Sequence, residues 1–278
     1  YSKDIYKTEQ KAYSMKIDTT LLKSFETKIP FSLTNSQKSC IKEIFEDLSS
    51  NYPMKRLLQG DVGSGKTIVA AAGVYAAIEN GAFKDQILPI EIKTRKGIEI
   101  FEIDEHPKPE PSMETLTGLR TAFKKDGVVT AGNASGINDG ASALILANED
   151  KAKKGKPLAR IVSYGFGGVD PDEMGMGPVP ATKMALNKAQ LTVADLDLIE
   201  SNEAFAAQAC AVNKQLGLNP EIVNVNGGAI ALGHPLGCSG SRITGTLLNL
   251  MEGQDVNIGL ATMCIGLGQG IATVIERV

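Results

Sequence analysis

The chain of 278 residues contains no tryptophan and only two histidines, His106 and His234. Its four cysteines show no Cys-x-x-Cys spacing, which indicates neither a zinc site nor a disulfide framework. The sequence has no apolar run near the roughly 18 residues of a membrane span, and no secretory signal opens it. With 29 basic and 32 acidic side chains, its net charge of −3 gives no reason to expect a nucleic-acid partner. We therefore expect a cytoplasmic globular protein with no metal site and no membrane contact.

Glycine, by contrast, is concentrated in loops that follow strand-like runs. Residues 226–242 hold five glycines and His234, directly after the strand-like run Ile222–Val225. Glycines let a backbone approach a ligand closely and adopt positive φ. Pro235 fixes the chain direction after the histidine, and Ser239 is expected to cap the helix that follows. The pattern predicts a loop that delivers His234 to a helix N-terminus.

Two other loops carry single reactive side chains at strand ends. Asn202-Glu-Ala-Phe-Ala follows a predicted strand at Asp197–Glu200 and precedes a helix. Cys264-Ile-Gly-Leu-Gly-Gln-Gly lies between the strand-like runs Ile258–Met263 and Ile271–Ile275. One asparagine, one histidine and one cysteine, each at the end of a strand, predict a composite site.

These three loops, Asn202-Glu-Ala-Phe-Ala, Gly233-His-Pro and Cys264-x-Gly-x-Gly-x-Gly, in this order and spacing resemble the C-terminal half of thiolases of the acetyl-CoA acetyltransferase kind. The resemblance runs from about residue 76 to residue 278. It implies an α/β fold with a layered mixed sheet and helices. It also implies Claisen condensation or thiolysis of acyl-CoA, with a coenzyme A thioester as substrate, no required cofactor and homo-oligomers in the family.

The resemblance implies a role for each residue of the composite site. Cys264 would be the base and acid, and His234 would activate a nucleophilic cysteine and donate into one oxyanion hole. Asn202 would hold a water in that hole, and Gly266 would offer a backbone N–H to a second. The alternatives are a structural histidine and a buried inert thiol.

Substrate contacts are also implied by the resemblance. Ala131, Gly132 and Ser135 would line the pantetheine tunnel, and Met174 and Phe205 would border the acyl pocket. From the residues alone, the run Val128–Gly140 is a strand, a small-residue loop and a helix start, so a tight strand–helix corner is the alternative. Apolar packing equally explains Met174 and Phe205.

The front of the chain carries a different pattern, Gly60-Asp-Val-Gly-Ser-Gly-Lys-Thr67, between a short strand at 54–59 and an alanine-rich helix to Asn80. In such a loop the glycine N–H groups (Gly60, Gly63, Gly65) converge on phosphates, Lys66 reaches the outer phosphates and Thr67 ligates Mg²⁺. ATP with Mg²⁺ is thus the ligand that this loop suggests.

An amphipathic helix is predicted before that loop. Thr34 and Gln37 have capping-box spacing, and Ile41, Ile44, Phe45 and Leu48 recur at helical spacing. From residue 30 to about residue 77 the chain resembles the first part of the motor domain of RecG-type DNA helicases. It lacks an acidic strand end and a second motor lobe, so it should not couple hydrolysis to movement.

We interpret the chain as a chimera, since no linker separates the two resemblances. The expected parts are a polar linker at 1–30, a truncated phosphate-loop segment at 31–81, a remnant of the thiolase N-terminal domain at 82–151 and the C-terminal domain at 152–278. The family's nucleophilic cysteine belongs to the N-terminal half, and Cys40 has helicase-like surroundings. We therefore expect an inactive chain. The alternatives are an ATP-binding helicase fragment and a non-catalytic coenzyme A-binding module.

Several local predictions complete the sequence analysis. The runs Ile87–Ile92 and Ile98–Ile103 read as two strands joined by a short turn. Thr192 and Asp195 suggest a further helix cap. Cys210 is expected in the core of its helix, and Cys238 is expected to pack rather than react.

Overall fold

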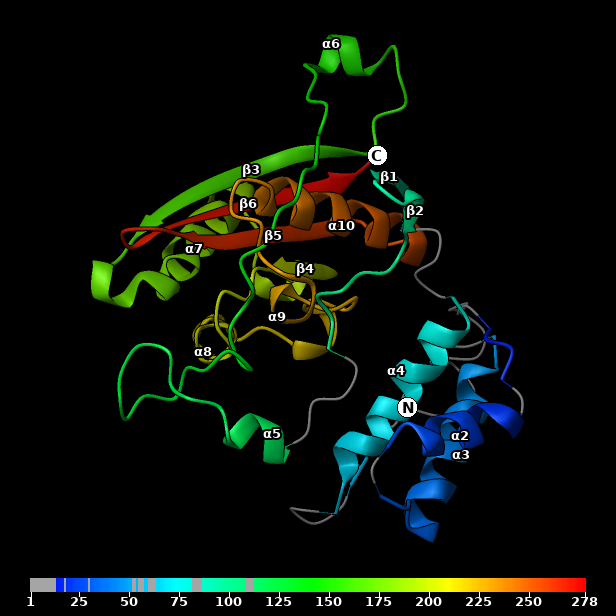
Figure 1. The fold of residues 1–278 in the computed structure, drawn as a ribbon. Helices are drawn as coiled ribbons and strands as arrows, with labels where there is room; N and C mark the ends of the chain where they lie inside the picture. Colours follow the sequence, from blue (N-terminus) through cyan, green and yellow to red (C-terminus); the bar gives the residue numbers. More distant parts are fainter. Residues whose placement is uncertain are drawn as a thin grey trace. The chain divides into compact units, whose positions relative to one another are not determined.

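The computed structural model describes residues 14–17, 19–29, 31–51, 54, 58–59, 64–81, 87–108 and 113–278. The chain divides into two compact units, Tyr1–Ser112 and Met113–Val278 (Figure 1). Across the described part of the chain, no helix is long and apolar enough to cross a membrane. The same residues contain no group of three or more His, Cys, Asp or Glu side chains arranged to hold a metal ion.

The first unit has a small helical core. It is built from α2 (Thr19–Thr27), α3 (Asn35–Leu48) and α4 (Lys66–Glu79). The predicted capping box is confirmed, because Thr34 Oγ1 accepts from the Gln37 N–H at 3.2 Å and Gln37 Oε1 accepts from the Thr34 N–H at 2.9 Å. The predicted apolar face of α3 is also confirmed: its buried residues pack in one cluster with α2 and α4 (Phe25, Ile41, Ile44, Phe45, Val69, Ala72, Ala76).

A two-stranded hairpin follows in the same unit. Strands β1 (Ile90–Thr94) and β2 (Gly97–Phe101) pair antiparallel. Gly97 has φ 130°, a conformation that glycine adopts without strain. The two predicted strands are thereby confirmed, but both are shorter and are shifted toward the turn that joins them.

The second unit is organised around a four-stranded mixed sheet. Its strand order is β3 (Ala159–Gly168), β6 (Gln269–Arg277), β5 (Ile258–Ile265) and β4 (Leu198–Ser201). Strand β6 pairs antiparallel with both β3 and β5, whereas β4 and β5 are parallel. Figure 1 shows β3, β6 and β5 as three long neighbouring arrows. The strand–helix alternation predicted for this region is confirmed.

Helices cover both faces of this sheet, and the period-2 alternation of each strand decides which side chain meets which helix. One face packs against α7 (Pro178–Ala189) and α8 (Ala206–Leu216), through residues such as Leu260 and Val274. The other face packs against α10 (Ser239–Gln254), through residues such as Leu198 and Ala261. The result is a three-layer α/β unit. Its shorter elements are α5 (Met113–Thr117), α6 (Glu149–Ala152), η2 (Pro171–Met176), η3 (Val193–Asp195), η4 (Pro220–Ile222) and α9 (Ala229–Leu232).

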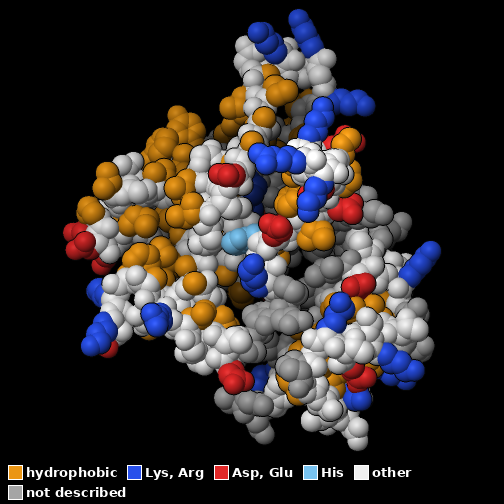
Figure 2. Space-filling model, in the orientation of Figure 1, with side chains coloured by type: hydrophobic (Ala, Val, Ile, Leu, Met, Phe, Trp, Pro, Cys, Tyr) orange, Lys and Arg blue, Asp and Glu red, His pale blue; other side chains and the backbone are white. Residues whose placement is uncertain are grey.

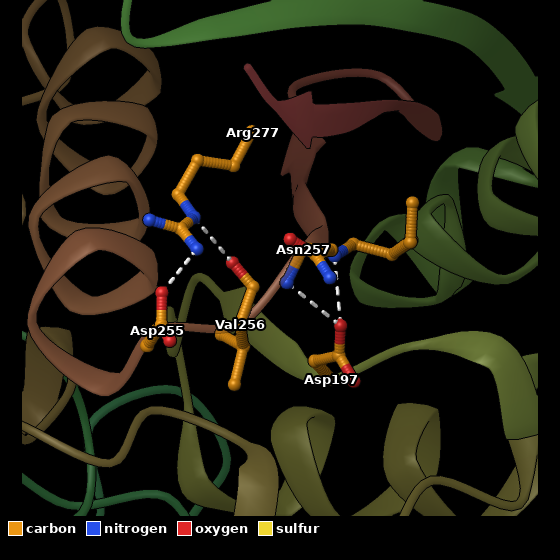
Figure 3. Close-up of polar contacts among 6 residues, drawn as sticks. Asp197, Asp255, Val256, Asn257 and Arg277 are labelled. Atoms are coloured by element: carbon orange, nitrogen blue, oxygen red, sulfur yellow. Dashed lines mark hydrogen bonds and ion pairs between the residues drawn. The ribbon is translucent and has the colours of Figure 1, made fainter.

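Polar contacts fix the register of β6, β5 and β4 at one end of the sheet (Figure 3). Just before β4, Asp197 Oδ2 accepts from the N–H groups of Asn257 and Ile258 at 3.0 and 2.8 Å. At the end of β6, Arg277 donates to the Val256 carbonyl at 3.0 Å and pairs with Asp255. These contacts lie at the amino-terminal ends of β4 and β5, so the opposite, carboxyl ends remain available for loops that carry function.

The predicted strand–loop–helix at residues 128–140 is wrong. Thr130 and Ala134 form only isolated bridges, and no helix begins between residue 128 and α6. Neighbouring apolar side chains stay in solvent, Ile145 at 98% exposure, because no described element packs over them. Short helices need such packing to be stable. Figure 2 shows hydrophobic side chains gathered on the surface of this unit.

Of three other local predictions, one fails, one holds only in part and one is confirmed. Cys210 is exposed rather than in the core, because α8 buries the face with Gln208, Val212 and Leu216. The predicted strand Ile222–Val225 is reduced to one parallel bridge between Val223 and Ile199. The cap predicted at Thr192 is present as a capping box with Asp195.

Candidate active site

Asn202 is positioned by the carboxyl end of β4. Its backbone N–H donates to the Thr262 carbonyl of β5 at 3.0 Å, which extends the parallel ladder by one step. The residue is 1% exposed, and its side-chain Nδ2 lies 3.4 Å from His234 Nε2. The two side chains that the sequence placed in one composite site are therefore neighbours in the structure.

His234 is held from its backbone and from its ring. Gly233, at φ 96°, turns the chain, and the His234 N–H donates to the Gly136 carbonyl at 2.8 Å. Ring atom Nδ1 lies 2.6 Å from Ser239 Oγ, and this oxygen is 3.0 Å from the Pro235 carbonyl. Ser239 was predicted to cap α10, but it is the first residue of that helix and makes no cap bond. Its hydroxyl is used to orient the histidine instead.

One tautomer of the His234 ring satisfies all of these contacts. The Ser239 hydroxyl donates to the Pro235 carbonyl, so its oxygen is free to accept from Nδ1–H. The lone pair then lies on Nε2, where it accepts from the Asn202 amide. Burial lowers the pKa of His234, and the charge of Arg242 lowers it further, so the resting ring is neutral. The ring thus presents a basic Nε2 on the Asn202 side.

Cys264 is brought to the same edge of the sheet by strand register. Ser201 pairs with Thr262, so Asn202 and Cys264 leave the carboxyl ends of two adjacent parallel strands. Such strands lie about 4.8 Å apart. Cys264 is 5% exposed, and burial raises the pKa of its thiol. The resting side chain of Cys264 is therefore a neutral thiol at neutral pH.

A buried carboxyl lies behind the site. Glu200 precedes Asn202 by two residues and is 1% exposed. Burial raises the pKa of Glu200 to about 7, Arg242 opposes this and Glu203 adds to it. Its role was not anticipated, because an acidic residue inside a strand gives no sign that it points inward.

Comparison with known proteins agrees with this geometry. The family model described as thiolase, C-terminal domain, matches residues 155–277, and the model described as thiolase, N-terminal domain, matches residues 70–150. Together the two models cover most of the chain, and the C-terminal model includes all three loops of the site. The chain belongs to the thiolase family.

Its thiolase relatives are longer than the chain. It is 56% identical over 234 residues to an acetyl-CoA acetyltransferase of Escherichia coli strain K12, covering 84% of the chain and 58% of that protein. The crystal structure of the Bacillus anthracis acetyl-CoA acetyltransferase superposes with a TM-score of 0.69 at 38% identity, over 99% of this chain and 64% of that one. Human mitochondrial 3-ketoacyl-CoA thiolase in complex with CoA gives 0.67 at 42% identity, over 93% and 58%. The chain therefore spans about six-tenths of the length of these relatives, and its fold is thiolase-like.

The thiolase chain places Gly266 in the turn between β5 and β6. This turn continues through Leu267 and Gly268, both at positive φ, 64° and 80°. A side chain at Gly266 would meet no atom within 4 Å. The backbone of Gly266 is therefore open to a ligand, two residues beyond Cys264.

The predicted substrate residues fall into two groups. Gly132 lines a cavity of about 480 Å³, together with residues that the sequence did not single out (Leu116, Thr117, Leu119, Thr121, Gly127, Val128, Thr130, Asn133). Ser135 instead donates its N–H and hydroxyl to the Ala204 carbonyl at 3.0 and 3.2 Å. Ala131 is exposed and lies next to cavity-lining residues in the chain. Phe205 packs edge-to-face on Phe123, with the two ring centroids 5.7 Å apart. Met174 lies half-buried in η2.

The predicted nucleotide residues belong to the first unit. Gly65 has φ 76°, and Lys66 and Thr67 open α4. The loop is tied to α3, because Gln37 Nε2 donates to the Ser64 carbonyl at 3.0 Å. Gly60 and Gly63 lie outside the described residues, as do residues 55–57 of the strand predicted before them.

Proposed function

We propose that the second unit carries the proton-transfer part of a thiolase-type acyl transfer, with coenzyme A thioesters as substrates. The observation that carries this proposal is the pairing of a basic His234 Nε2 with the Asn202 amide at 3.4 Å, at the sheet edge where Cys264 emerges. The names of the relatives, acetyl-CoA acetyltransferases and a 3-ketoacyl-CoA thiolase bound to CoA, support the substrate class.

In this proposal each group handles one proton or one charge. Cys264, once its thiol has released its proton to solvent, removes the α-proton of the acyl group as a thiolate and can return it as a thiol. The Asn202 amide holds a water on the thioester oxygen, and the Gly266 N–H serves a second oxygen. His234 Nε2 takes the proton of a nucleophilic thiol and then donates to the developing oxyanion. The reaction needs no resident cofactor, and the cavity beside Gly132 is the proposed seat of the pantetheine arm.

We also propose that the chain alone does not complete the reaction. None of its four cysteines lies in the family's nucleophile motif, and covalent acyl transfer requires that thiol. Cys40 sits on the edge of α3 in the first unit, with a packing role. As part of the same proposal, residues 31–81 are a helicase-like segment joined to thiolase sequence at 82–151 and 152–278.

Deuterium exchange tests the proton-transfer proposal without the nucleophile. The methyl group of acetyl-CoA is followed by NMR in D₂O with the full chain. We expect exchange above the buffer rate, a loss of about 100-fold or more in Cys264→Ser, and no change in Cys210→Ser, whose thiol is exposed. Exchange at the buffer rate would overturn the proposal. Thiolysis of acetoacetyl-CoA by the chain alone would overturn the proposed need for a further nucleophile.

A second candidate function, nucleotide binding by the first unit, rests on the positive φ of Gly65 at the start of α4 and on the Gln37–Ser64 contact. Titration with Mg·ATP tests it, with Lys66→Ala as the matched variant. Binding that Lys66→Ala abolishes supports it, and absence of binding by the unmodified chain rejects it. A third candidate, a non-catalytic CoA-binding module, predicts CoA affinity without any exchange that depends on Cys264.

A further inference from the structure

Asn224 adopts a backbone conformation that is unusual for a residue with a side chain. Its φ is 48°, in the left-handed region, where glycine is normally favoured. A non-glycine residue held there is strained, and surrounding contacts must compensate for the strain. Because Gly227 follows only three residues later, the site is not short of glycine. The asparagine side chain must therefore contribute something that glycine cannot.

That side chain acts as an additional peptide group beside β4. The neighbouring chain pairs with β4 through only one bridge, Ile199 to Val223. Beyond it, Asn224 Oδ1 accepts from the Ser201 N–H and Nδ2 donates to the Ser201 carbonyl, both at 2.8 Å. One carboxamide thus satisfies both the N–H and the carbonyl of Ser201, which a continued parallel strand would have bonded through two different residues.

The side-chain amide of Asn224 also contacts Glu203, the residue that follows Asn202. Asn224 Nδ2 also lies 3.2 Å from Glu203 Oε1, and the other oxygen of this carboxylate accepts from the Ile230 N–H at 3.3 Å. Ser201 and Glu203 are the two chain neighbours of Asn202. On the β5 side, the Asn202 N–H is bound by the Thr262 carbonyl at 3.0 Å. The backbone around Asn202 is therefore held from both sides.

We propose that Asn224 is a positioning residue for the proton-transfer site. It holds Ser201 and Glu203 in place, so that the side-chain amide of Asn202, which lies between them in the chain, points at His234 Nε2. The inference rests on the proposed function, since it assigns Asn224 to the geometry of that site. The Asn202–His234 contact is long, at 3.4 Å, so a shift of a few tenths of an ångström would break it.

Asn224→Asp is the test, because it keeps the shape of the side chain and removes both Nδ2 donors. A carboxylate oxygen would then face the Ser201 carbonyl and the Glu203 carboxylate, which repel it. Asn226→Asp is the matched control, since Asn226 lies two residues away and is exposed. Thermal unfolding of each full-length variant establishes that it is folded. If Asn224→Asp does not fold, Asn224→Gly takes its place, because glycine tolerates the left-handed backbone and removes only the side chain.

Two readouts separate positioning from general stability. The first is the imidazole NMR spectrum, in which the chain's two histidines give one signal from each unit. We expect the His234 signal to shift in Asn224→Asp while that of His106 does not, and neither to shift in Asn226→Asp. The second is acetyl-CoA exchange, where kcat should fall at least 10-fold with KM within 2-fold.

A folded Asn224 variant with an unchanged His234 signal and unchanged kcat would overturn the inference. If the unmodified chain shows no exchange, the proposed function fails. The His234 signal then still decides whether Asn224 positions the histidine's neighbour.

Discussion

The free energy of unfolding should fall as pH rises, and replacing Glu200 by glutamine should remove most of that decrease. Glu200 shares its face of β4 with Leu198, under α10, and no donor among the described residues reaches its Oε1. Burial raises the pKa of this carboxyl from an ordinary 4.5 to about 7. The folded state therefore holds the proton more tightly than the unfolded chain. The stability from this group is complete below pH 4.5 and declines as pH rises through 7.

The expected magnitude follows from that difference in pKa. Each pH unit is worth about 1.4 kcal/mol, so ionisation of Glu200 costs the folded state about 3 kcal/mol by pH 8. Glutamine does not ionise, so the variant does not carry this cost at high pH. The free energy of unfolding of Glu200→Gln, relative to the unmodified chain, should therefore rise by about 3 kcal/mol between pH 4.5 and pH 8.

Urea unfolding of the full chain, followed by circular dichroism at several pH values, measures this difference. Glu149→Gln is the control, because the side chain of Glu149 is 82% exposed on α6. Its curves should stay parallel to those of the unmodified chain. If the curves of Glu200→Gln are also parallel from pH 4.5 to pH 8, Glu200 is not a buried carboxyl with a raised pKa, and the reasoning fails.

Three further predictions follow from single contacts. Ser239→Ala removes the partner of His234 Nδ1, so ¹⁵N NMR of the ring should show mixed tautomers and exchange should fall about 10-fold; an unchanged ring spectrum would contradict the tautomer assignment. Gly165→Ala should lower the free energy of unfolding by about 3 kcal/mol in a urea titration, because its Cβ would lie 2.2 Å from a backbone oxygen of α7; a loss below 1 kcal/mol would show that the helix is not so close. Alkylation followed by mass spectrometry at pH 7 should modify Cys210 well before Cys264, whose burial raises the pKa of its thiol, and the reverse order would place Cys264 at the surface.

Elements with a local signal were predictable from the sequence. The capping box at Thr34 and the apolar repeat after it specify α3 within its own residues. The strands β5 and β6 are apolar runs separated by a glycine-rich turn, so both their existence and the place of Cys264 follow from pattern. The pairing of Asn202 with His234 was predicted on the premise that both follow strands, but only Asn202 does, because the run before His234 makes a single bridge.

Features that depend on distant partners were not predictable. Residues 128–140 have strand and helix propensity, but only packing would stabilise those elements, and Ile137, which is 82% exposed, shows that such packing is absent there. Cys210 lies among alanines, so the buried face of α8 could not be assigned by hydrophobicity. The Ser239 and Asn224 contacts depend on loop conformations that no periodicity encodes.

The most direct test of the account is a double-variant cycle on acetyl-CoA proton exchange. Exchange rates are measured for the unmodified chain, Cys264→Ser, His234→Ala and the combined variant. If the two side chains act in one site, the combined variant should lose little more than Cys264→Ser does alone, because residues that act as a unit are not additive. If instead the two losses multiply, Cys264 and His234 act independently, and the single proton-transfer site proposed here does not exist.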